Sequence, residues 1–467
     1  MSGRPGERRD AAEARSPGER RDAAGWLDVA ERAIEFARAA GADQAEALVM
    51  AGDSALTRFA NSEIHQNVAE SSATVNLRVV LGKRIAVVST GRTDDASLRR
   101  LAERGTQLAQ FVEPFDEFES LPAPTPIPGI SGAYAAATAE ATPELRAEAA
   151  RNVIAEADEA GVVSYGSFTT GVEWTAVANT LGVRAAEARS RAHLLTVAMG
   201  PDDGTGYAEA ASVDVGAIDP RALGREAAST ARASGHPIEL PPGDYPVVLG
   251  EYAVVDVLDY LGDLGFSALA VQQGRSFYEP GKRVGSELVT VWDDATDPAG
   301  APAAFDYEGV GKQRVPLLEA GVCREIVFDA QTAAAAGRTS TGHALPAPNV
   351  WGPMPLNQVI SAGTATREDL LGGLDRGLLV TRFWYTNPVH QKLVVMTGMT
   401  RDGTFLVEGG RIVGPVRNLR FTQSYLDAIA AVSAVGRDRK ALVGMLGTCV
   451  VPALRVDSFT FTGVSEG

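Results

Sequence analysis

The order of its strand-like segments constrains the fold of this chain more than any other sequence feature. Between residues 46 and 91, short runs rich in β-branched and alternating apolar residues follow one another without an intervening helix. Residue pairs typical of turns interrupt these runs, at 52–53, 61–62 and 82–83. Strands joined by tight turns pair antiparallel. The pattern therefore predicts an antiparallel meander, preceded by a helix that begins at about Trp26 and ends at Gly41.

The remainder of the chain predicts the same α+β class. Helical spacing of apolar residues recurs between further strand-like runs, over residues 95–111, 143–160, 220–233, 252–264, 367–374 and 424–435. We expect an N-terminal helix plus antiparallel meander domain, a middle region of helices and antiparallel sheet, and a β-rich C-terminal domain. Proline-rich stretches at 114–128 and 236–242 mark the boundaries. The predicted bounds are 25–125, 126–238 and 239–464.

The first 24 residues differ from the rest. The sequence PGERRDAA occurs at residues 5–12 and again at 17–24. These residues contain no apolar segment of the kind found in a secretory signal. We interpret residues 1–24 as a disordered repeat extension of mixed charge.

Composition limits the classes of function. The 467 residues include 43 Lys and Arg against 59 Asp and Glu, which gives a formal net charge of -16. An acidic chain repels phosphate backbones, so we expect no direct contact with nucleic acid. No apolar run is long enough to span a membrane, and we expect no membrane association. Two distant cysteines exclude a disulfide framework and favour the cytoplasm.

Common catalytic motifs are absent from the sequence. It contains no GxSxG, GxGxxG or HExxH. Its Gly-Lys pairs, among them Gly311-Lys312, lack the glycine spacing and the following Ser or Thr of a phosphate-binding loop. The five histidines share no helical face. Cys449 lies in a strand-like run and is interpreted as a small buried apolar residue.

Three carboxylates fall on one face of the predicted helix 252–264. Asp256, Asp259 and Asp263 are spaced i, i+3 and i+7. Such a face could hold a hard cation or provide a general base. The alternative, which is the commoner outcome, is a solvated polar face opposite apolar residues that pack inward.

Several longer segments together carry a more specific signal. They are residues 55–91, 274–300, 305–322, 405–421 and 451–463. In these segments the chain resembles the TldD/TldE (PmbA) family, known as zinc peptidases that act as a two-subunit complex. The resemblance covers about Trp26 to Gly463. Residues 341–351 and 367–383 resemble the TldE-type branch of that family.

One departure from the family pattern affects the chemistry. Catalytic TldD-type chains carry HExxxH on a helix, with two zinc-binding histidines and a glutamate base. The register of the resemblance places the first His on Asp259, the Glu on Tyr260 and the second His on Leu264. Leucine cannot bind a metal, and tyrosine is a poor base because its pKa is near 10. The family also uses a cysteine ligand nearer the C-terminus, and Cys449 lies too close to residues 450–453 to be its counterpart. We therefore expect no catalytic residue and no metal in this chain.

The resemblance implies a TldE-like, metal-free and non-catalytic subunit of a heteromeric TldD/TldE zinc metallopeptidase. The expected partner is a TldD-like HExxxH subunit that holds the zinc, and the expected substrate is an unfolded or leader peptide. The residues expected to contact peptide or partner are Asp256, Asp263, Arg275, Lys282 and Arg283.

Two alternatives from other classes remain. The first is a stand-alone, homo-oligomeric peptide-binding protein without catalysis. The second is a hydrolase that uses the three aspartates with Mg²⁺ or Mn²⁺.

Overall fold

The computed structural model of the protein describes residues 21–464, and one antiparallel sheet occupies its N-terminal half. The order of the six strands is β3-β2-β1-β4-β5-β6. Their bounds are β1 Gln44–Ala60, β2 Glu63–Leu81, β3 Arg84–Thr90, β4 Val163–Asn179, β5 Arg184–Met199 and β6 Thr205–Ser212. Because β1 pairs with β4 from Glu46 to Phe59, the strands of the predicted N-terminal and middle regions share a single sheet.

The strands of this sheet are longer than the sequence indicated. The predicted turns at 61–62 and 82–83 are confirmed, with positive φ angles at Asn61, Ser62 and Gly82. The turn predicted at 52–53 is wrong, because β1 runs through Gly52 without a break. Strands β2 and β4 flank β1 on both sides, and a Cβ atom at Gly52 would lie 3.3 Å from the Val172 carbonyl oxygen. This glycine therefore permits close approach between strands instead of a chain reversal.

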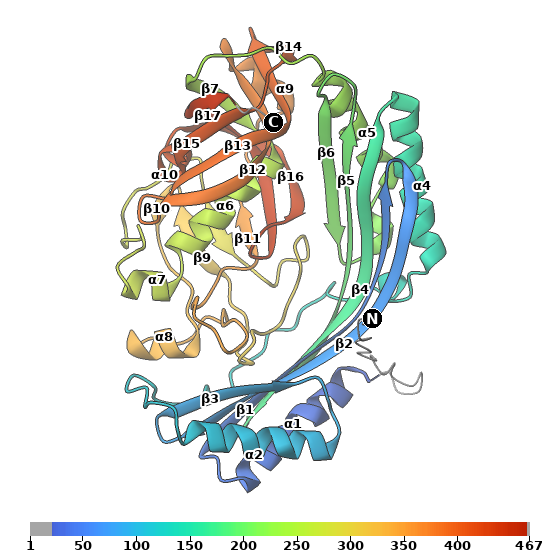
Figure 1. Ribbon diagram of the computed structural model, residues 1–467. Helices are drawn as coiled ribbons and strands as arrows, with labels where there is room; N and C mark the ends of the chain where they lie inside the picture. The colour runs from blue at the N-terminus through green and yellow to red at the C-terminus, as the bar shows by residue number, and fades with distance from the viewer. Residues whose placement is uncertain (1–20, 465–467) are drawn as a thin grey trace, which may run out of the picture.

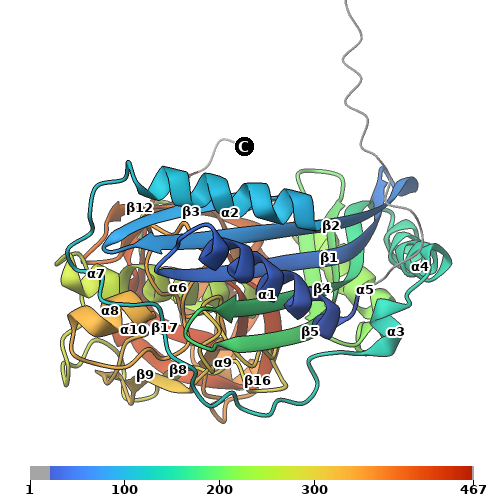
Figure 2. The ribbon, with the colours of Figure 1, turned by 90° about the horizontal axis from the view of Figure 1, so that it is seen from below.

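Helices cover the convex face of the sheet (Figures 1 and 2). They are α1 Ala23–Ala39, α2 Asp95–Ala109, α4 Pro143–Ala160 and α5 Pro220–Ala233, with the short α3 Ala136–Ala139 and η1 Val215–Ala217 between them. Each of the four long helices begins at a side-chain cap, which satisfies a backbone N–H that has no partner within the helix. Helix α1 begins inside the predicted extension, because Asp22 accepts a hydrogen bond from Gly25 N. The rest of that extension lies outside the described residues.

A second sheet of eleven strands forms the C-terminal half, which lies on the concave side of the first sheet (Figure 1). Strand β7 pairs with both β12 and β17, so β7, β12, β13, β15 and β17 form a closed ring. The bounds of these five are Gly243–Leu249, Arg376–His390, Val395–Glu408, Leu419–Ser424 and Thr448–Val464. The other strands are β8 Val291–Asp293, β9 Val315–Glu319, β10 Val322–Cys323, β11 Gln358–Ile360, β14 Arg411–Pro415 and β16 Val432–Val443. The predicted α+β class is confirmed.

The C-terminal half contains one long helix and four short ones. Their bounds are α6 Glu251–Gly265, α7 Ala268–Gln272, α8 Ala330–Ala335, α9 Arg367–Gly372 and α10 Tyr425–Ala430. The helix predicted over 424–435 is too long, because β16 begins at Val432 and pairs with β17. Aromatic rings fill the core beside α10, and the Phe383 and Phe421 centroids are 4.6 Å apart. No helix among residues 21–464 is long and apolar enough to cross a membrane.

A buried charged cluster joins the two halves. Arg78 of β2 donates to Glu46 of β1 at 2.6 Å and to Glu308 of the C-terminal half at 2.9 Å. Burial raises the pKa of Glu46 to about 7, and the Arg78 guanidinium opposes this rise. Since one guanidinium serves a carboxylate of the first sheet and one from a loop of the C-terminal half, this contact helps to fix how the halves meet.

Candidate functional site

Helix α6 carries the positions that the family register singles out. It follows β7 directly through Gly250 and packs against β12 and β17 of the ring. Most of its residues are buried, including Leu258, Leu261 and Leu264. Asp259 is buried as well, with 3% of its surface exposed. A solvated face for all three aspartates is therefore wrong, because the helix is enclosed nearly all round.

Protein groups close around the Asp259 carboxyl group. Met445 N donates to its Oδ2 atom at 2.6 Å, and the Cys449 thiol lies 3.7 Å from its Oδ1 atom. A Cβ atom added to Gly444 would come within 2.4 Å of Oδ2, so the 444–447 turn sits directly on the carboxyl group. Burial, with a smaller contribution from the charge of Asp256, raises the pKa of Asp259 to about 7.

The neighbouring polar side chains of α6 are satisfied by other elements. Tyr425 OH donates to Asp256 Oδ1 at 2.5 Å, and burial raises the pKa of Asp256 to about 6. Tyr260 OH donates to the Thr386 carbonyl oxygen at 2.7 Å. Burial raises the pKa of Tyr260 to about 12, so this residue is no base at neutral pH. Burial raises the pKa of Asp263, and the charge of the nearby Arg275 opposes this rise.

Cys449 is buried as predicted, and it lies closer to the α6 position than its spacing along the chain indicates. The register of the sequence placed it too close to residues 450–453 to occupy the family's cysteine position. In the structure β17 brings its thiol against Asp259, since a position set by strand pairing does not follow from spacing along the chain. Burial raises the pKa of this thiol well above its usual value.

The residues at this position do not fit a catalytic zinc ion. Such an ion needs three protein ligands and a water molecule. Asp259 and Cys449 are two candidate ligands, but burial raises the pKa of both and so favours their protonated forms. Leu264 is buried and offers no donor atom. Within residues 21–464 there is no group of three or more His, Cys, Asp or Glu side chains that could hold a metal ion.

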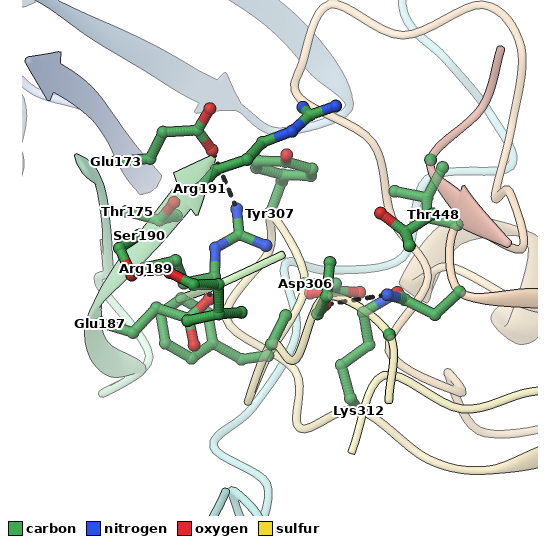
Figure 3. A pocket seen from close by; sticks show the side chains of 18 of the residues that line it. Glu173, Thr175, Glu187, Arg189, Ser190, Arg191, Asp306, Tyr307, Lys312 and Thr448 are labelled. Atoms are coloured by element: carbon green, nitrogen blue, oxygen red, sulfur yellow. Dashed lines mark hydrogen bonds and ion pairs between the residues drawn. The ribbon is translucent and has the colours of Figure 1, made fainter. Parts of the chain in front are cut away.

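A charged cleft borders the same turn, and Figure 3 shows its lining. Its volume is about 200 Å³, and Leu446 and Thr448 line it together with β4, β5 and the 300–312 segment. Figure 3 shows Glu187 and Arg189 of β5 on one side, with Lys312 and Thr448 on the other. The cleft therefore lies where the concave face of the first sheet meets the C-terminal half.

The carboxylates of the cleft have donors of their own. Arg189 lies 3.5 Å from Glu187 and 3.7 Å from Glu173. Asp306 accepts hydrogen bonds from the backbone N–H groups of Glu308, Val310 and Ala344. Burial, followed by the charge of Glu308, raises the pKa of Asp306 to about 7.

A buried pair, His343 and Asp293, lies next to the cleft residues Ala344 and Asn357. His343 Nε2 lies 2.8 Å from Asp293 Oδ1, and His343 Nδ1 lies 2.9 Å from Thr341 Oγ1. Asp293 Oδ2 accepts from Asn357 N at 2.7 Å. Burial acts to raise the pKa of Asp293, but His343, together with the charge of Lys312 and the Asn357 N–H, holds that pKa below its ordinary value. Both carboxylate oxygens of Asp293 therefore have partners, and these hydrogen bonds link β8 to the segments that contain His343 and Asn357.

Of the three basic residues predicted to contact peptide, Arg275 lies near Asp263 of α6, and none of the three lines the charged cleft. Arg275 Nε donates to Gln273 Oε1 at 2.7 Å. Lys282 pairs with Glu279, and Arg283 donates to the Ala320 carbonyl oxygen. Lys282 and Arg283 line a separate cavity of about 490 Å³ at the surface of the C-terminal half. Their contact with peptide or partner stays a prediction.

Sequence reasoning missed the cleft. Lys312 was considered only as part of an absent phosphate loop, and Arg189 and Asp306 were not singled out. The segment 305–322 carried family resemblance, which was the one available signal. No local spacing relates residues 187–191 to residues 306–312, because a sheet and a loop from different halves bring them together.

The fold and the site define an α+β protein in which a long curved sheet packs against a strand-ring domain. Solved structures share this architecture. TldE from Thermococcus kodakarensis has a TM-score of 0.86 at 20% identity, over 93% of this chain and all of that one. A Thermotoga maritima protein described as a modulator of a DNA gyrase has a TM-score of 0.83 at 20% identity, over 93% and 99%.

The family follows from the sequence models. Models described as PmbA/TldA metallopeptidase domain 1, central domain and C-terminal domain match residues 45–109, 134–234 and 242–463. The chain belongs to the PmbA/TldD family, and the resemblance is confirmed.

Curated relatives match a smaller part of the chain. The metalloprotease TldD homolog of Buchnera aphidicola (from Acyrthosiphon pisum) is 30% identical over 216 residues, which are 44% of this chain and 43% of that protein. The zinc metalloprotease TldD homolog of Saccharolobus solfataricus is 25% identical over 209 residues, 42% and 44% of the two chains. The chain thus spans less than half the length of these curated relatives.

Proposed function

We propose that this chain is a metal-free, non-catalytic TldE-like subunit of a heteromeric zinc metallopeptidase. The observation that carries the proposal is the closure of the α6 position. Asp259, Tyr260 and Leu264 stand in the register of HExxxH, and Met445 N and Cys449 occupy the space around Asp259. A catalytic zinc site needs an open coordination position for water, and this arrangement leaves no room for one.

The partner in this proposal is a TldD-like subunit that contributes HExxxH, zinc and the attacking water. This chain contributes walls to the enclosure around the substrate. The substrate class is an unfolded or leader peptide, which can be held by main-chain hydrogen bonds along a sheet. The concave face of the six-stranded sheet, with its exposed hydroxyl and charged side chains, supports this role. The complex would act in the cytoplasm.

A pull-down from the native host tests the proposal. The tagged full-length chain is isolated, its partner is identified by mass spectrometry, and zinc is measured in the complex and in the chain alone. We expect a stoichiometric partner with HExxxH, zinc in the complex and none in this chain. Peptide cleavage should require both subunits and be lost with a chelator.

Two results would contradict the proposal. A homo-oligomer without an HExxxH partner would favour the stand-alone peptide-binding protein instead. Tight binding of zinc, Mg²⁺ or Mn²⁺ by this chain alone would favour a metal site formed by Asp256, Asp259 and Asp263. Fractionation of host cells tests the compartment separately.

A further inference from the structure

Lys312 is the buried charge that the described residues leave without a direct partner. Its side chain lines the cleft, and only 6% of the residue is exposed. Asp293, Asp306 and Glu187 are its acidic neighbours, but within residues 21–464 none of them forms an ion pair or hydrogen bond with its ammonium group. Each of these carboxylates already accepts other hydrogen bonds. A largely buried lysine whose ammonium group has no partner is unfavourable, and an anionic group of a ligand in the cleft would compensate its charge.

The shape of the surroundings indicates an extended ligand. The cleft adjoins a second cavity of about 640 Å³ on the concave face of the six-stranded sheet. Both cavities are lined by Glu173, Thr175, Arg189, Arg191 and Tyr307. A ligand could therefore run along the sheet and end in the cleft beside Lys312, where about 200 Å³ is enough for a single residue.

The lining of the larger cavity suits a peptide main chain. Hydroxyl groups from three strands, β1, β2 and β4, line it, from Ser54, Ser72, Thr74, Thr169 and Thr175. Hydroxyl groups both donate and accept, so they can pair with peptide N–H and C=O groups whatever the side chains of the peptide. The carboxylates Glu173, Glu187 and Asp306 at the end of this path disfavour a doubly charged phosphate more than a singly charged carboxylate.

We infer that the cleft binds the C-terminal carboxylate of a peptide, with Lys312 as its cationic partner and the hydroxyl-lined cavity holding the residues that precede it. The inference rests on the proposed function for its ligand class, a peptide along the concave sheet, and deepens it by naming the peptide group that this chain binds without zinc or a partner subunit. It also sets the direction of the peptide, with its C-terminus toward the turn at 446–448 and its preceding residues along the concave sheet.

Calorimetric titration of the full-length chain tests the inference. The probe is an N-acetylated five-residue peptide of Gly, Ser and Ala with a free C-terminal carboxylate, compared with the same peptide as its C-terminal amide. One charge-assisted hydrogen bond should make the acid bind about 10-fold or more tighter than the amide. In Lys312→Met this preference should fall to about one. The matched control is Lys83→Met, at the exposed β2–β3 turn, which should keep the full preference.

Several results would overturn the inference. Equal binding of acid and amide by the wild-type chain would do so, even if Lys312→Met does not fold. So would a full preference retained in Lys312→Met, or no binding of either peptide. Inorganic phosphate that binds more tightly than the acid peptide would identify a general anion site instead. None of these outcomes bears on the partner and zinc experiment, so failure of the two proposals can be told apart.

Discussion

The α6 position and the charged cleft both border the same turn, residues 444–448, and differ in how their polar groups are satisfied. Around α6, Met445 N, Tyr425 OH and the Cys449 thiol meet the carboxyl groups of Asp259 and Asp256. In the cleft, Lys312 is enclosed but has no direct partner among the described residues. Closure by the protein's own groups is typical of a structural position, whereas an unpartnered buried charge beside a cavity is typical of a binding site. The family's catalytic position on α6 and the proposed binding cleft of this chain therefore need not coincide.

The largest effect should come from the charged junction beside the cleft. Arg78→Met leaves Glu46 and Glu308 buried without their shared cation, and we expect a loss of about 3–5 kcal/mol of stability at pH 8. The loss should shrink at pH 5, because Glu46, whose pKa is about 7, is then protonated. Urea unfolding at both pH values measures this. Arg104→Met, on the exposed face of α2, is the control, and an equally large loss there would remove the distinction.

A restored zinc motif should test whether the α6 position is closed by its surroundings. We expect the triple variant Asp259→His, Tyr260→Glu, Leu264→His to bind no zinc, although Cys449 lies close by. The 444–447 turn leaves no room for an imidazole, and overpacking with buried polar groups should cost about 2–4 kcal/mol. Zinc analysis and thermal unfolding are the measurements. Stoichiometric zinc would show that the position is open.

A smaller effect should separate Asp259 from an ordinary surface carboxylate. A carboxyl group whose pKa is raised by folding stabilises the fold fully below its unfolded pKa, and this contribution is lost as the pH rises through about 7. Asp259→Asn stays neutral. It should therefore be more stable than the wild type by about 1–3 kcal/mol at pH 8 and equal to it at pH 4. Denaturant unfolding at both pH values decides this, with Asp28→Asn on α1 as an exposed control. The same difference at both pH values would argue against a buried, protonated carboxyl group.

The smallest effect on stability should come from Lys312 itself. Replacing a buried ammonium group that has no partner with a methionine of similar length should stabilise the protein by about 1 kcal/mol at neutral pH. Residues kept at a cost to stability are a mark of binding sites, so this gain would sharpen the contrast with α6. Thermal unfolding of Lys312→Met beside Lys83→Met measures it. A clear loss of stability would place Lys312 among the structural residues.

Local signals in the sequence predicted local structure well. The periodicity of apolar residues predicted α4 and α5 at their observed bounds, and the Asn61-Ser62 pair predicted a hairpin that the structure confirms. The glycine at position 52 was misread, since a glycine in a central strand and one in a turn have the same local composition. Which of the two occurs depends on neighbouring strands far away in the chain.

The arrangement of the sites depended on contacts that no spacing reveals. Strand pairing brings Cys449 to Asp259, although the two are far apart in sequence. The meeting of β5 with the 300–312 segment creates the cleft, and nothing in either segment alone indicates the other. Family resemblance supplied the register of α6, but burial determined that Asp259 lies in a closed environment.

The closed ring of the C-terminal half has a consequence for how the chain matures during synthesis. The six-stranded sheet is complete by Ser212, so it can form while the ribosome is still translating. Strand β7 emerges next but must wait for β17, its partner on one side, which ends at Val464. Until then α6, whose residues are mostly buried in the folded chain, can pack against β12 but lacks the cover of β17. A nascent chain stalled before β17 would therefore expose part of the apolar surface of α6 beside a folded six-stranded sheet. The pairing of β17 with β7 is thus the folding step that most needs a chaperone.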